Sequence, residues 1–103
     1  MIRKKIKRGQ KVEVSFSPRE RALVLDYTFT GPELTTALRR AQLVAGRHVV
    51  RYMLDDLDEL LGFVAAEANH STDKKLHKEL DALYARLRRE MEPYDDGLWQ
   101  QAF

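Results

Sequence analysis

The apolar side chains of residues 57–68 recur with the spacing of one helical face, and this periodicity constrains the fold more than any other feature. A second stripe of the same spacing covers residues 76–91, and only a short polar segment, 69–72, separates the two. Amphipathic helices joined by so short a loop pack as an antiparallel hairpin. The two stripes consist of Leu57, Leu60, Leu61, Val64, Ala65 and Ala68, and of Leu76, Leu80, Leu83, Tyr84, Leu87 and Met91.

The ends of these two helices are predicted from capping residues and from proline. We expect the first to begin at a cap made by Asp55 and to continue to about Asn69. The second extends to about Met91, because Pro93 cannot continue a helix.

The first half of the sequence predicts strands as well as helices. Residues 11–16 alternate between polar and apolar side chains, as a half-buried strand does. The sequence SPRE at 17–20 is a capping box with proline in the first turn, so a helix is expected from Pro18 to about Thr28. A further helix is expected from Pro32 to about Ala45, with Gly46 as its C-terminal stop. Residues 47–53, rich in β-branched and aromatic side chains, indicate a second strand.

Together these patterns predict an α+β fold that is predominantly helical. Four helices accompany a small two-stranded sheet, in which residues 47–53 pair with residues 11–16 because a lone strand is not stable. Residues 12–24 can also be aligned with residues 49–61, so that Phe16 falls on Met53 and Leu23 on Leu60. This similarity suggests a βααβαα pseudo-repeat, with chance similarity of two amphipathic segments as the alternative.

The charges divide the 103-residue chain into parts of opposite sign. Residues 1–11 carry six lysines or arginines and no acid, although the net charge of the whole chain is only +2. We therefore predict a flexible basic arm at 1–10, one globular domain at 11–92, and an acidic and aromatic C-terminal tail at 93–103. No apolar stretch approaches the roughly 18 residues of a membrane span, and no signal-peptide core follows the basic start. A cytoplasmic location is expected.

Residue types and motifs argue against several classes of function. The chain has no cysteine, which excludes disulfides, thiolate zinc sites and a cysteine nucleophile. Nucleotide-binding glycine loops and the GxSxG nucleophile motif are missing as well. We therefore predict a protein that is not an enzyme, with no catalytic residue, no cofactor and no small-molecule substrate.

The basic residues give one candidate binding site. Lysine and arginine neutralise phosphates, so the arm and two arginines of the second predicted helix are candidate nucleic-acid contacts. Arg47 and Arg51 could extend this surface. The alternatives are a solvated tail, or an arm that docks on the acidic start of the third helix. The candidate contacts are Arg3, Lys4, Lys5, Lys7, Arg8, Arg39 and Arg40.

Histidines and acids could suggest a metal site, but their arrangement does not favour one. His70, Asp73 and His77 are the only histidine-containing group in one neighbourhood, and zinc needs three or four converging ligands. The acids at 55–59 lack the glycine and the ligand spacing of a calcium loop, and suit the positive end of a helix dipole instead. No metal site is predicted.

Aromatic residues outside the core stripes predict a surface for a partner. Phe63 lies off the main stripe of its helix, and three further aromatics lie in the tail: Tyr94, Trp99 and Phe103. Aromatic side chains are enriched in protein interfaces. The sequence does not establish a function. Its leading interpretation is a non-enzymatic interaction or self-association module, such as a homodimer, and its alternative is a nucleic-acid-associated protein.

The sequence LDELLGFVAAEANH at 57–70, with DKKL at 73–76 and ELD at 79–81, resembles a small family of uncharacterised bacterial proteins. The segment SPRER at 17–21 and the strand before it are similar to the first half of that family. The resemblance spans about residues 12–87. It implies a bacterial cytoplasmic protein and no activity, cofactor or site residue.

Overall fold

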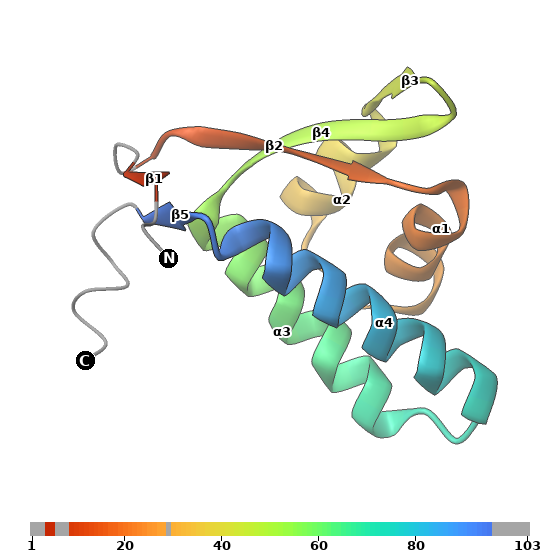
Figure 1. Cartoon of the computed structure of the whole chain (residues 1–103). Coiled ribbons are helices and arrows are strands. Elements are labelled where there is room, and N and C mark those ends of the chain that lie inside the picture. Colours follow the sequence, from red (N-terminus) through yellow and green to blue (C-terminus); the bar gives the residue numbers. More distant parts are fainter. Residues whose placement is uncertain (1–3, 6–8, 29, 96–103) are drawn as a thin grey trace.

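Four helices and a three-stranded antiparallel sheet make up most of the fold (Figure 1). The computed structural model describes residues 4–5, 9–28 and 30–95. The elements are β1 (Lys4–Lys5), β2 (Lys11–Phe16), α1 (Pro18–Tyr27), α2 (Pro32–Arg39), β3 (Gln42–Val44), β4 (Arg47–Met53), α3 (Leu54–His70), α4 (Lys74–Met91) and β5 (Tyr94–Asp95). The α+β class and the four helices are confirmed.

The main sheet has the order β2-β4-β3, so the prediction of two strands is wrong by one strand. The predicted pairing of the two longer strands is confirmed, because β2 lies antiparallel to β4 with Val14 opposite Val50. The additional strand is β3, which pairs antiparallel with the other side of β4. Figure 1 shows all four helices on one side of this sheet.

The third strand arises because α2 is shorter than its sequence pattern predicts. The helix ends at Arg39 instead of near Ala45, and the chain turns back through Gln42–Val44 along β4. The stripe positions beyond Arg39 are alanines, which bury little apolar surface in a helix. Pairing with β4 therefore decides the conformation of this segment. Gly46 lies in the turn between β3 and β4 and is not a helix stop.

The helical hairpin of α3 and α4 is confirmed and packs against the sheet (Figure 1). Asp73 caps α4 by accepting hydrogen bonds from two backbone N–H groups of its first turn. The predicted cap of α3 is wrong, because Met53 occupies that position and Asp55 lies inside the first turn. The helix follows β4 without a loop, so the end of the strand fixes where the helix begins.

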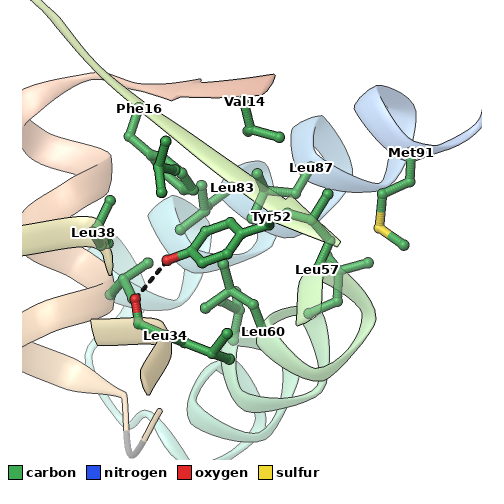
Figure 2. Close-up of a cluster of buried hydrophobic side chains, with 14 of the residues drawn as sticks. Val14, Phe16, Leu34, Leu38, Tyr52, Leu57, Leu60, Leu83, Leu87 and Met91 are labelled. Carbon is green, nitrogen blue, oxygen red and sulfur yellow. Dashed lines mark hydrogen bonds between the residues drawn. The ribbon is translucent and has the colours of Figure 1, made fainter. Parts of the chain in front are cut away.

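The core fills the space between the sheet and the helices (Figure 2). Phe16 from β2 and Leu38 from α2 are fully buried there, together with leucines from both helices of the hairpin. Full burial of each such side chain contributes roughly 1.5–3 kcal/mol. Tyr52 also lies in the core, where its hydroxyl donates a 2.6 Å hydrogen bond to the carbonyl of Leu34. Burial raises the pKa of this phenol, and the charge of Asp56 adds to the effect.

A second, very short pairing joins β1 and β5. The backbone of β1 lies parallel to that of β5, with Lys4 opposite Tyr94.

Within the main domain, β2 and β4 are each followed by two helices, but β3 lies between the halves and has no counterpart. The pseudo-repeat is not confirmed, and the predicted domain boundaries stay predictions. Among the described helices, none combines the length and the apolar character needed to cross a membrane.

Candidate interaction surface

The β3–β4 hairpin carries the most exposed large hydrophobic side chains among the described residues. Leu43 is 63% exposed and Val44 is 47% exposed, and Tyr27 follows at 39%. Figure 1 shows β3 at one edge of the sheet, away from the helical hairpin. Two neighbouring apolar side chains on a sheet edge are unusual, because proteins commonly protect such edges with charges or proline.

The backbone of β3 offers one unpaired position to the outside of the sheet. Val44 and Arg47 flank the two-residue turn, so they form the hydrogen-bonded pair that closes it. Hydrogen-bonded positions alternate along an antiparallel strand. The N–H and the C=O of Leu43 therefore point away from β4, and within the described part of the chain no other strand pairs with this edge.

The turn at the tip of this hairpin is strained. Ala45 has a φ of 50° and Gly46 has a φ of 80°, and positive φ at both positions is what a type I′ turn requires. Glycine adopts this conformation readily, whereas alanine pays about 1 kcal/mol for it. Strained backbone persists where the surrounding structure determines it, and it is concentrated at functional sites.

The segment from 34 to 54 is cationic and holds β3 in its middle. It contains Arg39, Arg40, Arg47 and Arg51, and no aspartate or glutamate. Arg51 lies opposite Glu13 on the neighbouring strand, and Arg47 pairs with Glu20. Arg39 and Arg40 are exposed, and no carboxylate of the described residues forms an ion pair with either.

A half-buried polar cluster fixes the turn end of the β3–β4 hairpin, at Arg47, to the rest of the domain. Glu20, in the first turn of α1, accepts a 2.6 Å hydrogen bond from Arg86 of α4, and Arg47 of β4 approaches it at 3.3 Å. Arg86 also donates to the carbonyl of Ser15 at 2.8 Å, while Nε of Arg47 donates to Oγ of Ser15 at 2.9 Å. We call Ser15, Glu20, Arg47 and Arg86 the clamp. It joins β2, α1, β4 and α4.

The clamp keeps its carboxylate charged. Partial burial by itself raises the pKa of Glu20, but a hydrogen bond from the Ser17 backbone N–H opposes it. Arg86 donates a second hydrogen bond, and the charges of Arg86 and Arg47 add to its effect. The pKa of Glu20 is therefore lowered overall. Arg86 also lies over the ring of Phe16, 5.8 Å from its centroid.

Four of the seven predicted nucleic-acid contacts lie among the described residues. Arg39 and Arg40 lie at the surface where α2 ends, next to β3. The backbone of Lys4 and Lys5 forms β1. The remaining arm candidates, Arg3, Lys7 and Arg8, lie outside the described residues.

Two of the four predicted partner aromatics lie among the described residues. Phe63 is half-buried on α3, and Tyr94 is partly buried against the core. Trp99 and Phe103 lie outside the described residues. A groove of about 400 Å³ between α3 and α4 is lined by Gly62, Ala65, Tyr84 and Arg88 among others, and also by two acids, Asp58 of α3 and Glu92 just after α4.

Asp73 and His77, two of the residues that the sequence places near each other as candidate metal ligands, have other partners. Nδ1 of His77 is 2.6 Å from the carbonyl of Ala68, and its Nε2 is 3.1 Å from Asp81. Asp73 is engaged in capping α4. In the part of the chain that the structure describes, no three histidines, aspartates or glutamates lie close enough together to hold a metal ion.

Sequence reasoning missed the exposed strand and the clamp for different reasons. The local signal for β3 is weak, because the turn Ala45-Gly46 has the glycine of a two-residue hairpin loop but not the preceding asparagine, aspartate or glycine that marks one. By contrast, Glu20 and Arg86 are 66 residues apart, and no local pattern connects them.

No protein-family model, curated protein or solved structure matches this chain. The resemblance to uncharacterised bacterial proteins therefore stays a prediction. Any function must be argued from the surface itself.

Proposed function

We propose that this protein is a non-enzymatic interaction module that binds an extended segment of a partner protein along β3. The observation that carries the proposal is the exposed edge strand, with Leu43 and Val44 on its two faces and the backbone groups of Leu43 pointing outward. An extended peptide that adds to such an edge gains main-chain hydrogen bonds for affinity and side-chain contacts for specificity.

The two faces of the edge give an added strand different neighbours. Leu43 lies opposite His48 and so shares the helix side of the sheet with Phe16, while Val44 lies opposite Arg47 on the other side. Residues of an added strand alternate in the same way. Because β3 has only three residues, the added strand makes few backbone contacts, and we expect modest affinity.

The clamp supports the proposal by holding the edge in place before a partner arrives. Arg47 is the β4 residue opposite Val44, and its side chain is tied to Ser15 and Glu20. A binding strand then meets a preorganised edge, which lowers the entropy lost on association.

Nuclear magnetic resonance tests strand addition directly. The full-length chain, labelled with ¹⁵N, is titrated with a capped peptide that alternates valine and threonine. We expect the largest shifts at the amides of residues 42–44. Leu43→Pro removes the outward N–H without removing a hydrogen bond to β4, and should abolish binding, whereas Leu43→Val should retain it.

A second reagent keeps this test decisive if Leu43→Pro does not fold. Methylating the backbone nitrogens on one edge of the peptide blocks pairing and leaves the protein unchanged. If the methylated peptide binds as well as the parent, or if the parent produces no shifts at residues 42–44, strand addition is wrong.

Self-association is the second form of the interaction hypothesis. Antiparallel pairing of β3 with β3 of another copy, centred on Leu43, would place Arg39 and Arg40 toward the turn and Arg47 of that copy, in a segment without acids, and like charges repel. The charges therefore favour a different protein as the partner. Sedimentation equilibrium at low and high salt measures self-association, and a dimer that strengthens with salt and is lost in Leu43→Pro would replace our choice of partner.

Nucleic-acid binding is the alternative function, and the exposed Arg39 and Arg40 favour it. Phosphate contacts produce affinity that falls steeply with salt. Gel shifts with single-stranded and double-stranded DNA at 50 and 200 mM salt test it, on the full chain and on a variant with residues 1–10 deleted. Binding that is indifferent to salt and to this deletion would contradict the alternative.

A further inference from the structure

We infer that the segment bound along β3 is acidic, an inference that rests on the proposed function and specifies its partner. The surroundings of β3 contain cations without matching anions. Arg40 precedes the strand by two residues and Arg39 by three, both are exposed, and neither has a carboxylate partner among the described residues.

Three acids of the neighbouring elements have other partners or lie away from β3 on their own helix or strand. Glu20 is held by the clamp, and Glu13 lies opposite Arg51 on the far side of β4 from β3. Glu33 lies in the first turn of α2, at the other end of the helix from Arg39. The β3 edge thus combines apolar side chains with two cations that remain available to a ligand.

An acidic peptide fits this combination better than a nucleic acid does. Phosphates would engage Arg39 and Arg40 but would leave Leu43 and Val44 in water, and the strand has no aromatic side chain on which a base could stack. An extended peptide with alternating acidic and apolar residues uses the free backbone groups, the apolar side chains and the arginines together. Its backbone pairs with Leu43, its apolar side chains cover Leu43 and Val44, and its carboxylates reach the arginines.

The expected selectivity follows from the strength of exposed charge pairs. Arg39 and Arg40 attract the carboxylates of an acidic peptide and repel the cations of a basic one. Each exposed charge pair is weak, and two of them together correspond to about a tenfold difference in Kd between the peptides at low salt. Salt screens interactions of this kind, so the difference should shrink at high ionic strength.

Two peptides of matched shape test the inference. One capped peptide alternates valine with glutamate and the other alternates valine with lysine, and both are titrated into the ¹⁵N-labelled full chain at 20 and 500 mM salt. We expect the acidic peptide to bind about tenfold more tightly at 20 mM salt, with shifts at residues 42–44. The double variant Arg39→Gln/Arg40→Gln should remove this preference.

The control makes the same change of charge elsewhere. Arg88→Gln/Arg89→Gln alters two exposed arginines of α4 and should leave the preference intact. Equal affinities of the two peptides, with shifts that Leu43→Pro abolishes, would overturn the acidic partner and leave strand addition standing. If neither peptide binds, strand addition fails as well.

An oligothymidylate in the same titration separates the remaining alternative. If it shifts the amides of Arg39 and Arg40 more strongly than the acidic peptide does, and if Leu43→Pro leaves that effect unchanged, the arginines serve a nucleic acid and the inference is wrong.

Discussion

Replacing Arg86 with methionine tests whether the clamp stabilises the domain. The side chains of Arg86 and Glu20 are 22% and 18% exposed, so this ion pair is neither a surface pair nor a fully buried one. Arg86→Met removes a hydrogen bond of 2.6 Å to a carboxylate and one of 2.8 Å to the Ser15 carbonyl. Methionine keeps most of the apolar length of the side chain.

The magnitude follows from these two contacts. Both donors belong to the charged guanidinium of Arg86, and a hydrogen bond that involves a charged group contributes about 1.5–3 kcal/mol, which the partial exposure of these side chains reduces. Arg47 still approaches Glu20 in the variant and offsets part of the loss. We therefore expect Arg86→Met to lower the free energy of unfolding by about 2–3 kcal/mol, which shifts the Tm of a domain of this size down by roughly 10–20 °C.

Urea unfolding monitored by circular dichroism measures this loss, with Arg89→Met as the matched control. Arg89 is exposed on the same helix, so its replacement should change stability by less than about 0.5 kcal/mol. A double-mutant cycle with Glu20→Gln should give a coupling energy of about 1–2 kcal/mol. Equal stabilities of Arg86→Met and Arg89→Met would refute the argument for the clamp.

The same pair predicts how stability depends on pH. The pKa of Glu20 is lower in the folded state than in the unfolded chain, so its stabilisation is fully present above the unfolded pKa of about 4.3. It is lost as the pH falls through the lower, folded pKa. The difference in unfolding free energy between the wild type and Glu20→Gln should therefore be constant near neutrality and shrink in acid. A difference that does not change between pH 7 and pH 2 would contradict this.

Three further substitutions test single contacts by thermal and urea unfolding. Ala45→Asn should stabilise the domain by about 0.5–1 kcal/mol, because asparagine tolerates the positive φ of this turn, and a loss of stability would contradict a strained turn. Tyr52→Phe should cost about 1 kcal/mol by removing the hydrogen bond from its hydroxyl to the carbonyl of Leu34, and an unchanged Tm would argue against that bond. Asp73→Ala should cost about 1 kcal/mol through loss of the α4 cap, whereas Asp73→Ser should retain most of the stability.

The sequence by itself determined the elements whose signals are local. The stripes of α3 and α4 follow from the spacing of residues three and four apart, and the capping box at Ser17 lies within one turn. The structure contains both helices and the capping box. The alternation of residues 11–16 likewise predicted which side chains of β2 are buried. Such patterns are reliable because the periodicity of an element and its buried face are properties of neighbouring residues.

Only the tertiary structure determined the conformation of residues 40–46 and the contacts of the clamp. By their local pattern, these residues extend the apolar stripe of α2. They form a strand instead, because pairing with β4 provides hydrogen bonds, whereas a longer α2 would bury only alanines at its added stripe positions. Arg86 and Glu20 meet because α4 returns past the start of α1, a relation that no local pattern encodes. The candidate interaction surface depends on both, since the shortened helix creates the β3 edge and the clamp holds its neighbouring strand.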